Sequence, residues 1–148
     1  MRAKSGFTLV EILIVVVILG ILAAIVIPQF TDASTEAKES SLKSDLQTMR
    51  SQIELYKIQH NDTAPALLTF EAQMTAYTLV DGSASVAGAA DTYGPYLQQV
   101  PTNQFNDLNT LDTDGVDGGG GWEYTAATGE IHPDDTDNCT DGTPHFDL

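Results

Sequence analysis

The sequence predicts an α+β protein in which a long N-terminal helix, transmembrane in one half and amphipathic in the other, packs on a small C-terminal head with a short antiparallel β-sheet. Three observations predict it: an apolar run, an apolar stripe at helical spacing, and two alternating segments flanking a turn. The expected segments are a basic leader at 1–6, a transmembrane helix at 7–27, an amphipathic spine helix at 28–60, and a globular head with an acidic tail at 61–148.

The apolar run reads FTLVEILIVVVILGILAAIVI from Phe7 to Ile27, and Glu11 is its only charge. A helix of this length spans about 30 Å, the thickness of the hydrocarbon core of a bilayer. A head of about 120 residues is too small to bury such a helix on all sides. Arg2 and Lys4 precede the run, so the positive-inside rule predicts Met1 in the cytoplasm and the head on the other side.

The order of residues around the run differs from an ordinary secretory signal. Such a signal has a shorter apolar stretch followed by a small-residue cleavage site. Here Pro28 follows the run, and the small residue, Gly6, comes before it. A protease acting on the cytoplasmic side could therefore remove the leader and leave the helix in place. The carboxylate of Glu11 costs a few kcal/mol inside a membrane and usually marks a function.

The sequence Gly6-Phe7-Thr8-Leu9-Val10-Glu11 resembles the class III signal of type IV pilins and type II secretion pseudopilins. The resemblance implies that a membrane prepilin peptidase cuts between Gly6 and Phe7, and that Phe7 is then N-methylated. In a fibre of packed helices, an unpaired carboxylate is expensive. We expect the ammonium of a neighbour's Phe7 to neutralise Glu11 at one axial stagger, so that Glu11 sets the register between subunits.

The second half of the helix is expected to be an amphipathic spine. Pro28 removes a helical hydrogen bond, so we expect a kink or local melting there, with a simple helix end as the alternative. Residues 29–60 contain no Gly or Pro, and their apolar side chains recur on one stripe: Leu42, Leu46, Met49, Ile53 and Tyr56. Two favourable charge pairs are expected on or near the opposite face: Glu39–Lys43 and Glu54–Lys57.

The head is expected to begin after a break at residues 61–65. We expect a short helix at 69–77 with Thr69 as its N-cap, a loop at 81–91, and an extended stretch at 93–101. The alternating segments 122–124 and 130–132, on either side of a turn, predict a β-hairpin. The tail after Pro133 is expected to be loosely ordered, with Cys139 as a lone surface thiol.

Charge is distributed unevenly and excludes some partners. The net charge is −15, and residues 58–148 contain 15 Asp and Glu but no Lys or Arg. Binding to DNA or RNA depends on Lys and Arg, so no nucleic-acid partner is expected. One cysteine and three scattered histidines do not form a zinc pattern, and no hydrolase motif is present, so we do not expect an enzyme.

A glycine-rich acidic loop comes just before the hairpin. Asp112, Asp114 and Asp117 alternate there with Gly115 and Gly118. Carboxylates with tight turns suit calcium, which takes six to eight oxygen ligands. The family that the N-terminal motif resembles includes a major pseudopilin with calcium in its C-terminal loops, so the resemblance favours a calcium site here. A solvated acidic loop without a metal is the alternative.

Two further stretches indicate which of these fibres the chain resembles. Residues 46–56 resemble the spine helix of the type II secretion major pseudopilin, and residues 94–101 with 121–129 are similar to its later head. Type IV pilins more often close their C-terminal region with a cysteine pair, which one cysteine cannot form.

The resemblance implies a structural subunit of a type II secretion pseudopilus that drives the export of folded proteins. The implied partners are further copies of the chain, minor pseudopilins, the prepilin peptidase and the inner-membrane assembly platform. The implied location is the bacterial inner membrane, single-pass, with a cytoplasmic N-terminus and a periplasmic head. The alternative is a type IV pilin, forming a surface fibre for adhesion, motility or DNA uptake.

Overall fold

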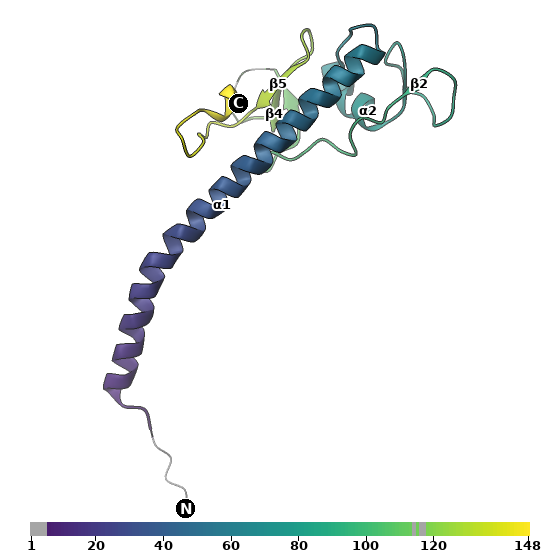
Figure 1. Cartoon of the computed structure of the whole chain (residues 1–148). Coiled ribbons are helices and arrows are strands. Elements are labelled where there is room, and N and C mark those ends of the chain that lie inside the picture. Colours follow the sequence, from purple (N-terminus) through teal and green to yellow (C-terminus); the bar gives the residue numbers. More distant parts are fainter. Residues whose placement is uncertain (1–5, 114, 116–117) are drawn as a thin grey trace, which may run out of the picture. The chain divides into compact units, whose positions relative to one another are not determined.

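The computed structural model describes residues 6–113, 115 and 118–148 (Figure 1). The chain divides into two compact units, one up to Ala37 and one from Lys38 to Leu148. The helix α1 (Leu9–Gln59) contributes to both. A long helix and a small head with short strands confirm the predicted α+β class.

In the first unit, α1 presents its apolar side chains to the surroundings. Phe7 is 81% exposed, and the large apolar residues of the expected span are all at least 41% exposed. Among the described residues, α1 is the one helix long and apolar enough to cross a membrane. The helix includes Pro28 and does not end there, which rules out a simple helix end at this residue. The expected kink stays a prediction.

In the second unit, the remainder of α1 buries the predicted stripe. All five of its members are buried: Leu42, Leu46, Met49, Ile53 and Tyr56. Lys57 and Glu54 form the predicted salt bridge at 2.9 Å. The placement of Glu39 on the opposite face was wrong, because this residue is 7% exposed. Glu39 lies three residues before Leu42, which puts both on the same helical face.

The head adds short elements on this face of α1. A 3₁₀ turn (Leu67–Thr69) leads into α2 (Phe70–Thr75), where Thr69 is the N-cap residue but makes no side-chain capping bond. The strands β1 (Thr78–Leu79) and β2 (Thr92–Tyr93) pair antiparallel around the expected loop.

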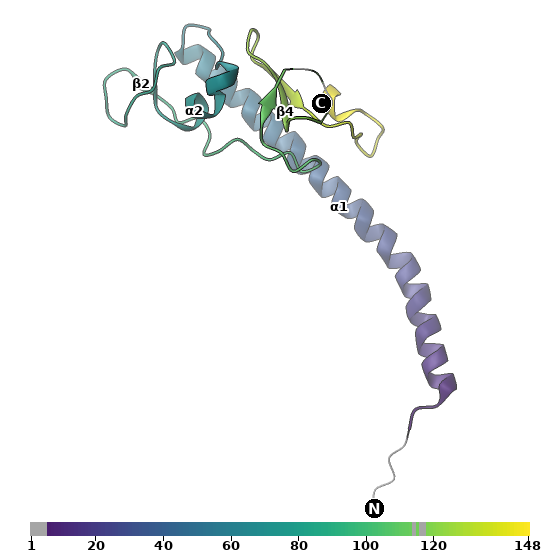
Figure 2. The same cartoon turned by 180° about the vertical axis from the view of Figure 1, so that it is seen from behind.

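The second sheet contains β3 (Leu111–Asp112), β4 (Trp122–Thr125) and β5 (Glu130–Pro133). The predicted hairpin is confirmed, since β4 and β5 pair antiparallel from Trp122↔Pro133 to Thr125↔Glu130. The sheet as a whole is mixed, because β3 pairs parallel to β4. Both views place β4 beside the second half of α1 (Figures 1 and 2).

The core lies between α1, α2 and the hairpin. Its buried members all have an apolar or aromatic side chain: Leu42, Leu46, Met49, Ile53, Tyr56, Phe70, Met74, Leu97, Val100, Trp122, Tyr124 and Ile131. Tyr124 also donates a hydrogen bond to the carbonyl oxygen of Pro65 at 2.8 Å. Side chains alternate between the two faces of a strand, so Trp122 and Tyr124 lie on the same face of β4 and are both buried in the core.

The segment after β5 is packed, so the expectation of a loosely ordered tail was wrong. Asp134, Asp135 and His145 are buried, and Cys139 is a free thiol that is only 4% exposed. The expectation of a surface thiol was therefore wrong as well. Acidic composition suggested a solvated tail, but hydrogen bonds within the head compensate for the burial of the Asp134 and Asp135 carboxylates.

Candidate functional site

The N-terminal motif forms a capping box at the start of α1. Thr8 stands directly before the first helical residue, and both its backbone nitrogen and its hydroxyl lie 3.1 Å from Oε2 of Glu11. The backbone nitrogen of Glu11 donates in return to Oγ1 of Thr8 at 3.2 Å. This reciprocal pattern satisfies donors that a helix N-terminus otherwise leaves unpaired.

The capping box gives the Glu11 carboxylate partners within its own chain. The residue also lies in the first turn, where the helix dipole favours a negative charge. A carboxylate with these contacts is less costly in an apolar setting than an isolated one. Sequence reasoning identified Gly6, Phe7 and Glu11 but missed Thr8, which the T-x-x-E pattern of a capping box could have indicated.

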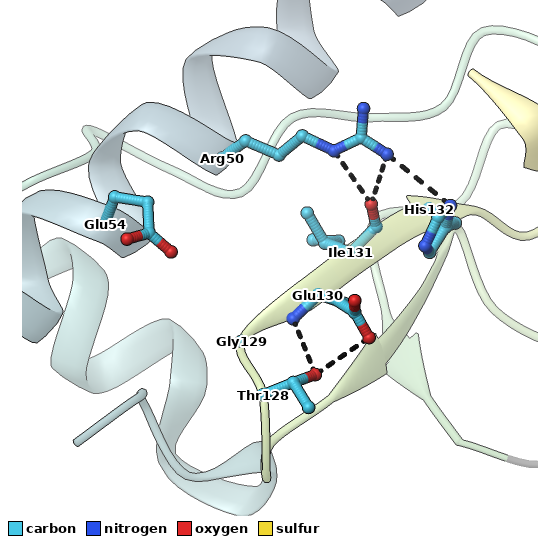
Figure 3. A pocket seen from close by; sticks show the side chains of 7 residues that line it. All are labelled: Arg50, Glu54, Thr128, Gly129, Glu130, Ile131 and His132. Carbon is cyan, nitrogen blue, oxygen red and sulfur yellow. Dashed lines mark hydrogen bonds between the residues drawn. The ribbon is translucent and has the colours of Figure 1, made fainter. Parts of the chain in front are cut away.

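A second set of contacts joins α1 to the hairpin through Arg50. Its Nε and Nη2 atoms both donate to the carbonyl oxygen of Ile131, at 3.2 and 2.9 Å (Figure 3). Its Nη1 atom donates to the carbonyl oxygen of Leu148 at 2.7 Å. Arg50, Glu54 and the turn from Thr128 to His132 line a shallow pocket there. The guanidinium of Arg50 already donates to backbone oxygens of the head. We therefore assign this pocket to the packing of the hairpin against α1 and not to ligand binding.

Two carboxylates meet beside the predicted calcium loop. Asp134 accepts hydrogen bonds from the backbone nitrogens of Gly118, at 3.0 Å, and Gly120, at 2.6 Å. A β-carbon at Gly120 would lie 2.6 Å from Oδ2 of Asp112 and 3.3 Å from Oδ2 of Asp134. Glycine at this position therefore lets both carboxylates approach the same backbone.

Of the three predicted calcium ligands, the structure describes Asp112. Asp112 is half-buried on β3, whereas Asp114 and Asp117 lie outside the described residues. Within residues 6–113, 115 and 118–148, no three His, Cys, Asp or Glu side chains gather as metal ligands do. Asp134, which faces the loop from beyond β5, was missed because nothing in its local sequence indicates this contact.

Comparison with known proteins agrees with the N-terminal geometry. A family described as "Prokaryotic N-terminal methylation motif" matches residues 1–27. The type II secretion system core protein G of Pseudomonas aeruginosa is 47% identical over 57 residues, covering 38% of this chain and 40% of that protein. A fimbrial protein of Pseudomonas aeruginosa is 29% identical over 143 residues, 94% of this chain and 86% of that protein. No solved structure matches the chain.

A further relative is similar over most of both chains. The type II secretion system core protein G of Vibrio cholerae is 30% identical over 130 residues, which cover 82% of this chain and 88% of that protein. With the methylation motif, the exposed apolar helix and the small α+β head, this similarity places the chain in the type II secretion system core protein G family, the major pseudopilins.

Proposed function

We propose that the chain is the structural subunit of a type II secretion pseudopilus, polymerising through its N-terminal helix to drive the export of folded proteins. The observation that carries this proposal is the exposed apolar surface of α1 over the expected span, with Glu11 as its only charge. Such a surface is stable only in lipid or against other apolar helices. A subunit that moves from membrane to fibre uses the same surface in both settings.

The capping box suggests how Glu11 serves both settings. In a single chain in the membrane, Thr8 partners the carboxylate. After removal of residues 1–6, the new amino group of Phe7 carries a positive charge and can pair with Glu11 of a neighbour. A charged donor forms a stronger bond than a neutral hydroxyl. Assembly therefore adds an ion pair that exists at one stagger only, while the hydrogen bonds from Thr8 keep the carboxylate oriented.

The partners and the location follow from this role. Copies of the chain, minor pseudopilins, the prepilin peptidase and the inner-membrane assembly platform are the proposed partners. The chain spans the bacterial inner membrane once, with its N-terminus in the cytoplasm and its head in the periplasm. This orientation agrees with the positive-inside rule, because Arg2 and Lys4 precede the span and no Lys or Arg follows it until Lys38.

The test is mass spectrometry of the mature protein from bacteria that carry the secretion system. The expected N-terminal residue is methylated Phe7. A mature chain that begins at Met1, or that lacks residues 1–27, would contradict both the processing and the polymerising helix.

A surface pilus remains the second candidate, and the similarity to fimbrial proteins favours it. The two functions differ in a deletion strain. Loss of the chain from a pseudopilus stops export of folded proteins across the outer membrane, whereas loss from a surface pilus removes visible fibres and leaves export intact.

We also propose that the loop at Asp112, Asp114 and Asp117 binds calcium. The carboxylates of Asp112 and Asp134, which meet at Gly120, are oxygen ligands of the kind calcium takes. Bound calcium would supply positive charge to a strongly acidic head. The thermal midpoint of the protein should rise on calcium addition and respond less in Asp112→Asn, while Asp91→Asn in the exposed loop should behave as wild type. An unchanged midpoint in wild type would contradict the site.

A further inference from the structure

We propose that residues 134–148 form a detachable C-terminal strap, pinned to α1 by Glu39 and Arg50, that opens as a unit while the apolar core stays folded. The strap follows directly after β5 and ends beside α1 at Leu148. Both pins lie in the compact unit that begins at Lys38.

The first pin is a buried carboxylate with a partner far away in sequence. Oε1 of Glu39 accepts hydrogen bonds from the backbone nitrogen of Thr140, at 2.6 Å, and from its hydroxyl. In the described part of the chain, no Lys or Arg forms a salt bridge with Glu39. A buried carboxylate is costly unless its hydrogen bonds are satisfied, so the donors of Thr140 account for its burial. Thr140 belongs to a turn in which Gly142 donates to the carbonyl of Cys139 at 2.8 Å.

The second pin is Arg50, whose Nη1 atom holds the carbonyl of Leu148. Glu39 and Arg50 are eleven residues apart, about three helical turns, so they lie on the same face of α1. Both pins therefore lie on one face of the helix, and Lys43, which interacts with Cys139, lies between them in the sequence. Arg50 also donates to the carbonyl oxygen of Ile131, which belongs to the core. This second contact keeps the Arg50 side chain in position when the strap opens and its bond to Leu148 breaks.

Inside the strap, the buried side chains are Asp134, Asp135, His145 and the thiol of Cys139, which lies outside the apolar core cluster. Asp135 accepts a hydrogen bond from Nδ2 of Asn103 at 2.6 Å, and its other oxygen lies 2.6 Å from Nδ1 of His145. The backbone nitrogen of Asp137 donates to the same Asp135 side chain at 3.1 Å. The strap is thus held by hydrogen bonds, including those that Asp134 accepts from Gly118 and Gly120, and by one His–Asp pair. Ring contacts of His145 with Phe105 and of Phe146 with His132 add to these.

The apolar core, by contrast, is built without the strap. Its last fully buried member in sequence is Ile131, and from the strap only Leu148, among the described residues, packs partly against it. Hydrogen bonds contribute modestly to stability because water replaces them on opening, whereas exposing the core loses its full hydrophobic contribution. An opening that hydrates Glu39, Asp135 and the turn therefore needs less free energy than global unfolding.

Cys139 and Trp122 allow the opening and the core to be measured separately. Cys139 is the only cysteine and is buried in the strap, where burial raises the pKa of its thiol and further slows its reaction. Trp122 is the only tryptophan and is buried in the core. Reaction of Cys139 with a disulfide reagent such as DTNB reports strap opening, and Trp122 fluorescence reports the core.

The first experiment uses the full wild-type chain in detergent micelles. The rate of Cys139 modification is measured at urea concentrations below the unfolding transition of Trp122. Local opening exposes little surface, so the logarithm of the rate should rise only weakly with urea. A slope equal to that of global unfolding would overturn the proposal, because it would show that Cys139 becomes accessible only when the core unfolds as well.

The second experiment removes the first pin. Thr140→Val keeps the shape and removes the hydroxyl donor, and we expect Cys139 to react about tenfold faster. Glu39→Ala should increase the rate at least as much, and Trp122 fluorescence should stay native in both. Glu36→Ala, the same change at an exposed position one turn earlier, is the matched control and should react as wild type. Unchanged rates in both pin variants, or faster rates only together with loss of native Trp122 fluorescence, would overturn the proposal.

Discussion

Arg50 and Ile131 are joined by two hydrogen bonds from one guanidinium to one carbonyl oxygen, at 2.9 and 3.2 Å, across 81 residues of sequence. Ile131 is the buried centre of β5, so the charge on α1 fixes the position of the hairpin against the helix. Arg50 is the only base on α1 that joins the helix to both β5 and the final residue, among the contacts of the described residues.

Replacing Arg50 should destabilise the head. Arg50→Ala leaves two half-buried carbonyl oxygens without their donors, and we expect a loss of about 2–4 kcal/mol in the free energy of unfolding. Arg50→Lys keeps the charge but not the planar fork, so it should recover only part of this loss. Urea unfolding followed by Trp122 fluorescence measures both. Gln47→Ala, an exposed change one turn earlier, is the control, and an equal effect in control and Arg50→Ala would contradict the assignment.

The capping box predicts a difference between two threonine variants. Thr8→Val removes the hydroxyl that both donates to and accepts from Glu11, so we expect fewer fibres, whereas Thr8→Ser should assemble as wild type. Glu11→Ala should leave the chain in the membrane and abolish assembly, because no carboxylate remains to pair with Phe7. Shearing and electron microscopy measure the fibres, and membrane fractionation measures insertion. Normal fibres from Glu11→Ala would contradict the role in register.

Gly121 occupies a position where the backbone of another segment passes very close. A β-carbon there would collide with the carbonyl group of Leu108. Gly121→Ala must displace one of these segments, and we expect a loss of about 2–3 kcal/mol in stability. The same change at Gly20, which has no neighbouring atom within 4 Å, should leave the stability of the head unchanged. Urea unfolding measures both, and a neutral Gly121→Ala would show that the loop adjusts freely.

The head should lose stability in alkali through Tyr96. Burial, with a smaller effect of nearby Tyr56, raises the pKa of Tyr96 to about 12. Its hydroxyl donates to Oε1 of Gln59 at 2.6 Å, a bond that requires the proton. Because the folded pKa lies above the unfolded value of about 10, this contribution is complete below pH 10 and is lost as the pH rises toward 12. Tyr96→Phe should flatten part of the decrease in stability between about pH 10 and 12; an identical pH dependence would contradict this.

Local patterns determined much of this protein. The apolar run and the glycine before it predicted the membrane segment and the processing site, because hydropathy and residue order need no tertiary contact. The stripe from Leu42 to Tyr56 and the alternation around Trp122 gave the spine and the hairpin, because burial on one face imposes a period on the sequence.

Only the tertiary structure decided how the acidic half of the chain is held. Glu39 meets Thr140 across 101 residues, and Arg50 meets Leu148 across 98. Composition alone predicted a solvated tail and a surface thiol, because carboxylates are usually hydrated. In the fold, hydrogen-bond donors that are distant in sequence compensate for the lost hydration, and no local pattern shows where such donors will be.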